Sequence, residues 1–161
     1  MEGWTRITGI CREPAIINFL KISETLDTAG QPQAGHFAAL AQAGYDAVIN
    51  LAVPASSNFL TNESQLCAQN NLRYTHIPVE WKNPTRKNLE EFFALMESLK
   101  ERKVFVHCAL NMRVSAFVFL HRVIRLAETP EVAMKDLRRI WQPDEVWSAF
   151  IERMLRESRQ A

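Results

Sequence analysis

The sequence predicts an α/β fold in which a mainly parallel central sheet is flanked by helices. Stretches with the period of a strand alternate with stretches with the period of a helix, which is the pattern of such folds. The run at 46–53 is rich in apolar and β-branched residues, as is typical of a strand buried on both faces. The 161 residues contain no internal repeat or linker-like stretch, so we expect a single domain over 1–161 with its core at about 20–157.

The first half of the chain is divided by turn-forming residues. Residues 15–20 fit either a short helix or a strand that enters the core. A short strand within 25–32 is broken by a glycine and a proline, and a helix over 33–43 has apolar residues on one side and a glycine after its end. The strand at 46–53 follows, and a polar loop then leads to a helix over about 62–70 with an asparagine or threonine cap.

The second half begins with alternation and continues mainly with helices. Residues 72–79 alternate as a strand, and 85–100 carry a clear apolar stripe at helical spacing. A further strand starts at Lys103, and a strongly apolar helix is expected over 114–126. Two more helices follow, each introduced by a proline and acidic residues that suit a first turn.

Composition and charge limit the classes of partner. Apolar residues make up 47% and charged residues 23%, and 19 basic against 18 acidic side chains give a net charge of +1. This balance gives no support to nucleic-acid or membrane-surface binding. No apolar run approaches the ~20 residues that span a bilayer, and the first residues lack the pattern of a signal peptide. Cys11, Cys67 and Cys108 have no CxxC spacing, so we expect neither a disulfide nor a metal site, and a cytoplasmic location.

The stretch KVFVHCALNMRVSAF at 103–117 is the strongest candidate for a functional site. An apolar strand ends at His107 and Cys108, and helical spacing begins at Arg113. A strand, a tight loop and a helix start place a thiol among free backbone N–H groups at the positive end of a helix dipole. In parallel sheets ligands bind beyond the carboxyl ends of the strands, which is where Cys108 falls. The stretch therefore predicts an anion-binding loop.

This loop, with the segments that precede it, resembles a known family. The segments TAGQP at 28–32, YDAVINLAVP at 45–54 and YTHIPVE at 74–80 precede the HC loop in this order. Together they resemble the cysteine-based protein tyrosine phosphatases, in particular a small bacterial branch of the dual-specificity type, over about residues 20–125. The resemblance implies a dual-specificity protein tyrosine phosphatase-like fold.

The resemblance also implies an activity and a set of roles. The protein would be a cysteine-dependent phosphatase whose Cys108 thiolate attacks a phosphomonoester, with protein phosphotyrosine among the candidates, and forms a phosphocysteine. Arg113 would clamp the phosphate, Ser115 would help the thiolate to leave, and His107 would hold the cysteine through backbone hydrogen bonds. No cofactor or metal is implied. The residues that would cradle the phosphate are Cys108, Ala109, Leu110, Asn111, Met112, Arg113 and Val114.

The loop departs from the phosphatase pattern in two ways. Only four residues separate Cys108 from Arg113, where the phosphatase signature has five, and rhodanese-type sulfurtransferases resemble this shorter length. Ser115 nevertheless stands seven residues after the cysteine, where the phosphatase hydroxyl belongs. Asn111 occupies the position of a common glycine, and asparagine is the other residue type best suited to positive φ. We therefore expect a left-handed backbone at Asn111.

The proton donor is harder to assign. The family supplies an acid from a loop after the preceding strand, and Glu80 is the only carboxylate of the matching loop. A solvated loop glutamate is an equally good interpretation, and Asp144 and Glu145 are alternatives that also suit the first turn of a helix. Trp81 could line the mouth of the site or anchor its loop, and Asn50 could support the cysteine loop or satisfy its own backbone.

Three functions remain open on the sequence. The first is a phosphatase acting on a phosphorylated protein or small molecule, with no nucleic-acid or membrane partner. The second is a rhodanese-like sulfurtransferase that carries a persulfide on Cys108. The third is a non-catalytic phosphate-binding or interaction module. The alternative to all three is purely structural and makes Cys108 a buried core thiol. Neither the substrate nor the oligomeric state follows from the sequence.

Overall fold

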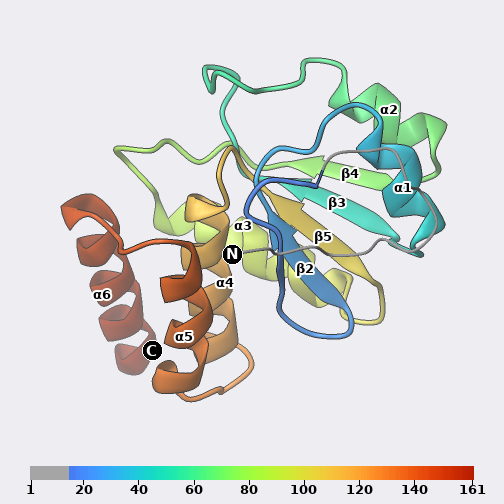
Figure 1. The fold of residues 1–161 in the computed structure, drawn as a ribbon. Coiled ribbons are helices and arrows are strands. Elements are labelled where there is room, and N and C mark those ends of the chain that lie inside the picture. Colours follow the sequence, from blue (N-terminus) through green and yellow to red (C-terminus); the bar gives the residue numbers. More distant parts are fainter. Residues whose placement is uncertain (1–14) are drawn as a thin grey trace.

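The computed structural model describes residues 15–161, so Cys11 and the segment inspected for a signal peptide lie outside it. Within the described residues, five strands form one sheet in the order β1-β2-β5-β3-β4 (Figure 1). β1 pairs antiparallel with β2, and the other neighbouring strands are parallel. The predicted α/β class with a mainly parallel sheet is therefore confirmed.

The elements alternate along the chain as the periodicity predicts. Described helices follow each of the strands β2 to β5, and the last strand is followed by three helices in succession. In chain order the elements are β1 (Leu20–Lys21), β2 (Leu26–Ala29), α1 (His36–Gln42), β3 (Ala47–Asn50), α2 (Glu63–Gln69), β4 (Arg73–His76), α3 (Arg86–Ser98), β5 (Val104–His107), α4 (Met112–Ile124), α5 (Pro130–Ile140) and α6 (Glu145–Gln160).

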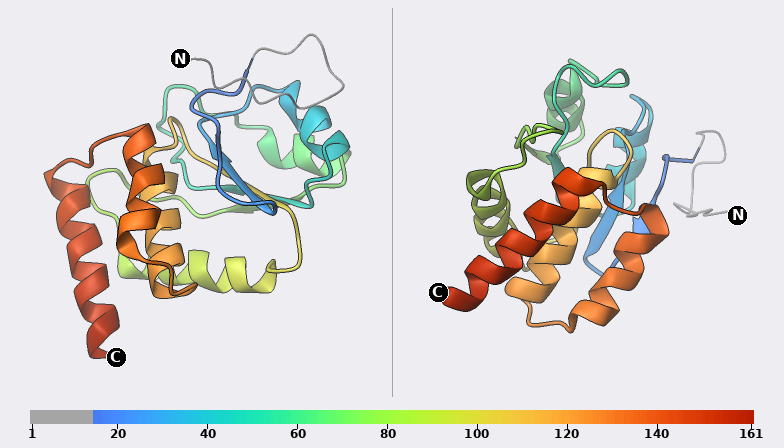
Figure 2. Two further views of the ribbon diagram at one scale, coloured as in Figure 1. Left: turned by 60° about the horizontal axis from the view of Figure 1, so that its bottom comes forward. Right: turned by 90° about the vertical axis from the view of Figure 1, so that its left-hand side faces the viewer.

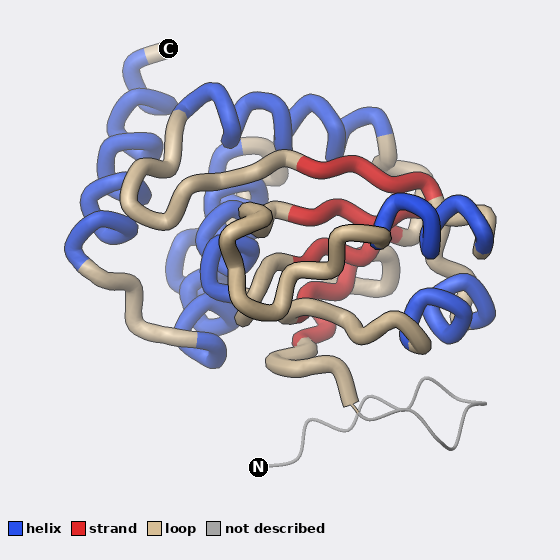
Figure 3. Tube along the Cα trace, turned by 90° about the horizontal axis from the view of Figure 1, so that it is seen from above, coloured by secondary structure: helices blue, strands red, loops and turns tan. Residues whose placement is uncertain are grey.

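The sheet buries both faces. Along β5, Val104 and Val106 join the larger core beneath α3 to α6, whereas Phe105 joins a second core beneath α1 and α2. This division follows from the two-residue period of a strand, which sends successive side chains to opposite faces. The strands form the central layer between helices in a view from above (Figure 3), and α4 contacts both α5 and α6 (Figure 2).

Some boundaries differ from the sequence prediction. Residues 15–20 are mostly irregular, with only Leu20 in the short β1. α4 begins at Met112 rather than at residue 114, because Asn111 takes the N-cap position and its carbonyl already accepts a hydrogen bond from Ser115. No helix of the described residues is long and apolar enough to cross a membrane.

The parallel register brings three strand ends to one level. His107 at the end of β5 lies opposite Ala29 of β2 on one side and Asn50 of β3 on the other. Gly30 then makes an isolated bridge with Leu110, and a Cβ on this glycine would lie only 2.6 Å from the carbonyl oxygen of Ala109. The absence of a side chain at Gly30 thus lets the chain after β2 lie directly against the loop that follows β5.

Candidate active site

Cys108 lies at the first position after β5, in the centre of the sheet edge. Its side chain is fully buried, and its backbone N–H donates to the carbonyl of Ala29 at 3.3 Å. A buried thiol at a strand end is what both an active-site loop and a core cysteine would show. The geometry of the loop around the thiol therefore decides between an active-site cysteine and a core cysteine.

The backbone of this loop is held by its carbonyl groups. Each carbonyl from Cys108 to Met112 has a donor on the protein side, and these donors come from β5, α4 and three separate segments upstream. The Cys108 carbonyl lies 3.2 Å from the His107 ring Nδ1, and the Ala109 carbonyl accepts from the Gln31 backbone (3.1 Å) and from Asn58 Nδ2 (3.1 Å). The Leu110 carbonyl accepts from Asn18 Nδ2 (3.0 Å). The carbonyls of Asn111 and Met112 accept from the Ser115 backbone (2.9 Å) and from Ser115 Oγ (2.8 Å), respectively.

The N–H groups of the same loop remain free. Among the described residues, no N–H group of residues 109–114 makes a hydrogen bond of ordinary length and angle to the protein, apart from the weak pairing that the Gly30–Leu110 bridge implies. In a trans peptide the C=O and the next N–H point in opposite directions, so carbonyls bound outward turn the N–H groups inward. Converging N–H groups at a helix N-terminus form an anion-binding concavity. This geometry is not expected of a loop that merely carries a core thiol.

Asn111 supplies the turn that closes the loop. Its φ of 67° and ψ of 3° confirm the predicted left-handed backbone at this position. Its side chain is buried, and Nδ2 donates to the carbonyl of Asn18 at 2.9 Å and to Thr28 Oγ1 at 3.0 Å. A glycine could adopt this φ without strain, but asparagine adds two contacts to β2 and the segment before β1.

Arg113 lies on the first turn of α4, beside the free N–H groups. Its guanidinium carbon lies 5.4 Å from the centre of the Trp81 ring, and only 7% of the residue is exposed. The buried Nε has no hydrogen-bond partner, and no carboxylate of the described residues lies within ion-pair distance. A buried cation without an acceptor is costly, so the position of this guanidinium suits an anionic ligand.

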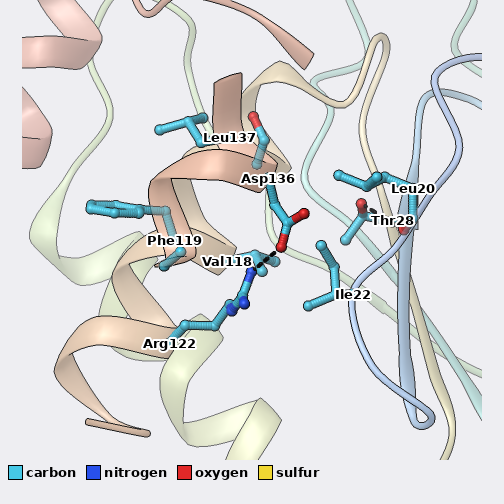
Figure 4. A pocket seen from close by; sticks show the side chains of 10 residues that line it. Leu20, Ile22, Thr28, Val118, Phe119, Arg122, Asp136 and Leu137 are labelled. Carbon is cyan, nitrogen blue, oxygen red and sulfur yellow. Dashed lines mark hydrogen bonds and ion pairs between the residues drawn. The ribbon is translucent and has the colours of Figure 1, made fainter. Parts of the chain in front are cut away.

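Ser115 faces a different part of the molecule. Its Oγ donates to the Met112 carbonyl and accepts from Trp141 Nε1 at 3.0 Å, and no hydrogen bond joins it to Cys108 among the described contacts. It also lines a small cavity of about 10 Å³ between α4, α5 and the β1–β2 strands, room for about one water molecule (Figure 4). The expected help from Ser115 to the thiolate thus lacks a contact in this structure and stays a prediction.

The loop after β4 carries the candidate acid. Glu80 is exposed, and its carbonyl closes a turn by accepting from Asn83. The next residue, Trp81, packs against Trp141 and Trp147, and its carbonyl accepts from Trp147 Nε1 at 2.9 Å. Trp81 therefore both anchors its loop and lies over Arg113, so the backbone holds Glu80 next to the residue that covers the guanidinium.

The contacts of Asn50 and Asp144 fit the structural one of the two roles that the sequence left open for each. No hydrogen bond of the described residues joins the Asn50 side chain to the cysteine loop: Oδ1 accepts from the Ala52 backbone at 2.8 Å and Nδ2 donates to Tyr74 Oη at 3.1 Å. Its side chain satisfies a backbone group after its own strand and the hydroxyl of Tyr74 on β4, which fits the alternative role, and its support of the loop stays a prediction. Asp144 caps α6 by accepting from the Trp147 backbone, which leaves Glu80 as the better candidate for the acid.

The structure adds two site residues that sequence reasoning missed. Glu63, on the first turn of α2, is buried, and its Oε2 lies 2.7 Å from His107 Nε2 while its Oε1 accepts from Gln31 Nε2 at 2.6 Å. Gln31 belongs to the TAGQP segment, where we expected a short strand broken by a glycine and a proline. The one available signal was position, because both residues follow strands whose carboxyl ends meet at the same edge.

Among the described residues, Cys67 and the possible metal ligands add no group to the site. Cys67 is buried on α2 within the second core, as expected for a core residue, and burial raises the pKa of its thiol to about 12. Within residues 15–161, no group of three or more histidine, cysteine or carboxylate side chains is placed to hold a metal ion.

Comparison with known proteins gives a direct family match. A family profile described as "DSP-PTPase phosphatase fused to NAD+ Kinase" matches residues 20–149. A crystal structure from Shewanella putrefaciens CN-32, described as a candidate phosphatase of the DUF442 family, is 30% identical with a TM-score of 0.80. The alignment covers 89% of this chain and 94% of that one. No curated protein sequence gives a significant match.

More distant structures share the fold. Tk-PTP in its active form is 17% identical with a TM-score of 0.70, covering 88% of this chain and 96% of that one. PTPMT1 in complex with PI(5)P is 18% identical with a TM-score of 0.74, covering 89% and 99%. The profile spans residues 20–149 and so includes the cysteine loop, and the Shewanella alignment covers most of the chain. The chain therefore belongs to the dual-specificity protein tyrosine phosphatase family and is a phosphatase-like hydrolase.

Proposed function

We propose that the protein hydrolyses a phosphomonoester through a phosphocysteine intermediate on Cys108. The observation that carries this proposal is the buried Arg113 guanidinium, which has an unpaired Nε and no carboxylate partner among the described residues. Beside it lie the free N–H groups of residues 109–114. A phosphoryl group carries the negative charge and the acceptor oxygens that both sets of donors lack.

The reaction follows from this arrangement. The phosphoryl oxygens accept from the loop N–H groups and from Arg113, which places phosphorus next to the Cys108 sulfur. The thiolate attacks phosphorus, the bond from phosphorus to the ester oxygen breaks, and Glu80 gives its proton to the departing oxygen. Glu80 then takes a proton from water, the water oxygen attacks phosphorus, and cleavage of the S–P bond returns the thiolate and releases inorganic phosphate.

The shortened loop is compatible with phosphate binding for a specific reason. The left-handed Asn111 turns the chain within the four residues between Cys108 and Arg113, and the outward carbonyls keep the N–H groups convergent. The more distant structures include complexes with PI(5)P and, in Pseudomonas aeruginosa TpbA, with pTyr. Both ligands are phosphomonoesters. The half-buried Trp81 over Arg113 and the exposed Leu110 within the loop favour an ester with an aromatic or other apolar group next to its phosphate.

The test uses p-nitrophenyl phosphate with wild type, Cys108→Ser and Cys67→Ser. Cys67 is the matched control, because it is equally buried but lies in α2 outside the loop. We expect phosphate release by wild type and Cys67→Ser, and loss of release in Cys108→Ser. Retained hydrolysis in Cys108→Ser would contradict the proposal. Thiosulfate and cyanide, tested in parallel, should give no thiocyanate.

A second experiment tests Glu80 as the acid. Glu80→Gln should slow hydrolysis of phenyl phosphate by about 10²- to 10⁴-fold, the usual contribution of a general acid. Hydrolysis of p-nitrophenyl phosphate should fall less, because its leaving group needs less protonation. Glu145→Gln, an exposed carboxylate on α6, is the matched control and should have little effect. Equal losses on the two esters would exclude proton donation by Glu80.

A further inference from the structure

We propose that Glu63 is a positioning residue that sets the orientation of the cysteine loop through two hydrogen-bonded arms, His107 and Gln31. Glu63 itself touches no substrate in this proposal. The inference rests on the proposed function, because it concerns the loop that would bind the phosphoryl group. It goes further by assigning a role to a residue 45 positions before the cysteine.

Among the described residues, Glu63 and Asp27 are the buried carboxylates, and Glu63 is the more deeply buried of the two. Only 1% of Glu63 is exposed, although it lies on the first turn of a surface helix. Burying a carboxylate is costly unless both oxygens are satisfied. Here Oε1 accepts from Gln31 Nε2 at 2.6 Å and Oε2 lies 2.7 Å from His107 Nε2, so each oxygen has a donor from a different strand end.

The first arm runs through His107. Its ring is fully buried at the end of β5, with Nε2 toward Glu63 and Nδ1 3.2 Å from the Cys108 carbonyl. The Cys108 carbonyl can only accept, so the contact at Nδ1 is satisfied when that nitrogen carries a proton and donates it. Donation from Nδ1 turns the Cys108 carbonyl toward the protein interior, and the Ala109 N–H consequently points the other way, into the anion site.

The second arm runs through Gln31. Its Nε2 donates to Glu63 and also to the Pro32 carbonyl at 3.1 Å, which fixes the residue just after β2. Its backbone N–H donates to the Ala109 carbonyl at 3.1 Å, beside the contact from Asn58. The Leu110 N–H is therefore directed into the loop. The two arms thus end on consecutive carbonyls at the base of the anion site.

His107 is the basic group that faces Glu63 in this arrangement. Among the described residues, His107 is the only basic side chain within ion-pair distance of Glu63. The other titratable groups near the pair are Cys67 on α2, Tyr74 on β4 and Cys108 itself. Burial raises the pKa of both Cys67 and Tyr74, so these two groups stay neutral around neutral pH and do not replace the charge of Glu63.

The experiment compares Glu63→Gln with Asp27→Asn. The glutamine keeps the shape of Glu63 but removes its charge and one acceptor. Asp27 is the matched control, because it is a buried carboxylate on β2 that bonds Tyr45 and does not touch the loop. For p-nitrophenyl phosphate, Glu63→Gln should lower kcat/KM by about tenfold to a hundredfold, the effect of losing a charge-assisted hydrogen bond, whereas Asp27→Asn should change it less than about twofold.

A double-mutant cycle separates positioning from general destabilisation. If Glu63 acts through His107, Glu63→Gln should add little to the loss already caused by His107→Asn. The same Glu63→Gln substitution should keep its full effect in the Asp27→Asn background. Additive losses with His107→Asn would overturn the first arm.

A measurement without substrate tests the inference independently of turnover. ¹⁵N NMR should show a proton on His107 Nδ1 in wild type, and Glu63→Gln should shift the His107 ring nitrogen resonances and the Ala109 and Leu110 amide resonances. Unchanged loop amides in Glu63→Gln would overturn the positioning role even if wild type is inactive. If Glu63→Gln does not fold, Gln31→Met removes the second arm alone. It should then shift the Leu110 amide, and an unshifted amide would overturn that arm.

Discussion

Asn111 is the residue whose substitution tests the closure of the loop most sharply. It combines a left-handed backbone, with φ at 67°, and a buried side chain that donates to Asn18 and Thr28. Asn111→Gly keeps the backbone angle free of strain but removes both side-chain contacts. Asn111→Ala removes the same contacts and also leaves a residue with a Cβ but no polar side chain in the left-handed region.

The magnitudes follow from these two terms. Each hydrogen bond contributes about 0.5–1.5 kcal/mol, so the loss of both costs about 1–3 kcal/mol in either variant. The left-handed conformation costs a residue with a Cβ about 1–2 kcal/mol of stability, and this cost applies to alanine but not to glycine. Asn111→Ala should therefore lose about 1–2 kcal/mol more unfolding free energy than Asn111→Gly. For a chain of this size that difference corresponds to about 2–8 °C in Tm.

The assay is urea or thermal unfolding, repeated with inorganic phosphate. Asn71→Ala is the matched control, because Asn71 also has a positive φ, 57°, but lies exposed in the turn after α2. It should lose about 1–2 kcal/mol of stability and keep the full stabilisation by phosphate. Both Asn111 variants should lose part of the phosphate effect. Equal stability of Asn111→Ala and Asn111→Gly would refute the strain argument, and an unchanged phosphate effect would refute the role of Asn111 in loop closure.

Three further predictions concern single side chains. Arg113→Met should abolish the stabilisation by inorganic phosphate in thermal unfolding. Without phosphate, its stability should change by less than about 1 kcal/mol, because the substitution removes both an unpaired buried charge and that charge's contact with Trp81. Persistent stabilisation by phosphate would contradict the role of Arg113 as the phosphate clamp. Burial, with a smaller effect of Arg125, lowers the pKa of His121 in the folded protein. The unfolded chain therefore protonates this histidine more readily than the folded one does, and the free energy of unfolding falls as the pH drops below about 6.5. His121→Leu should lose less unfolding free energy than wild type between about pH 7.5 and 5.5, and an identical loss would contradict this. Burial raises the pKa of Cys67 to about 12, so iodoacetamide near neutral pH should label its peptide only after unfolding, as mass spectrometry can show.

Much of the fold was predictable because its signals are local. The strand and helix periods, the glycine after α1 and the threonine cap of α3 each depend on a few adjacent residues. The left-handed Asn111 was predictable for the same reason, since the position and the residue type carry the information. The buried apolar β3 and β5 implied a parallel sheet, and that in turn placed Cys108 at its carboxyl edge.

The site residues that were missed depend on distant parts of the chain. Glu63 and His107 are separated by 44 positions, and a glutamate at a helix start is ordinarily solvated. Ser115 has the expected spacing from Cys108, but its hydroxyl binds Trp141, which is 26 residues away and on the connection between α5 and α6. Asn50 stands at a strand end as expected, yet its amide is used by Tyr74 of the neighbouring strand. Spacing alone could not decide among such partners.

The covalent intermediate on Cys108 offers the most direct test of the proposed chemistry. Wild type mixed with p-nitrophenyl phosphate and denatured rapidly should carry a phosphoryl group on the peptide that contains Cys108, detectable by mass spectrometry. The group should be absent in Cys108→Ser and present in Cys67→Ser. Phosphate release without any phosphoryl group on Cys108, or a phosphoryl group on another residue of a turning-over enzyme, would contradict the assignment of Cys108 as the nucleophile.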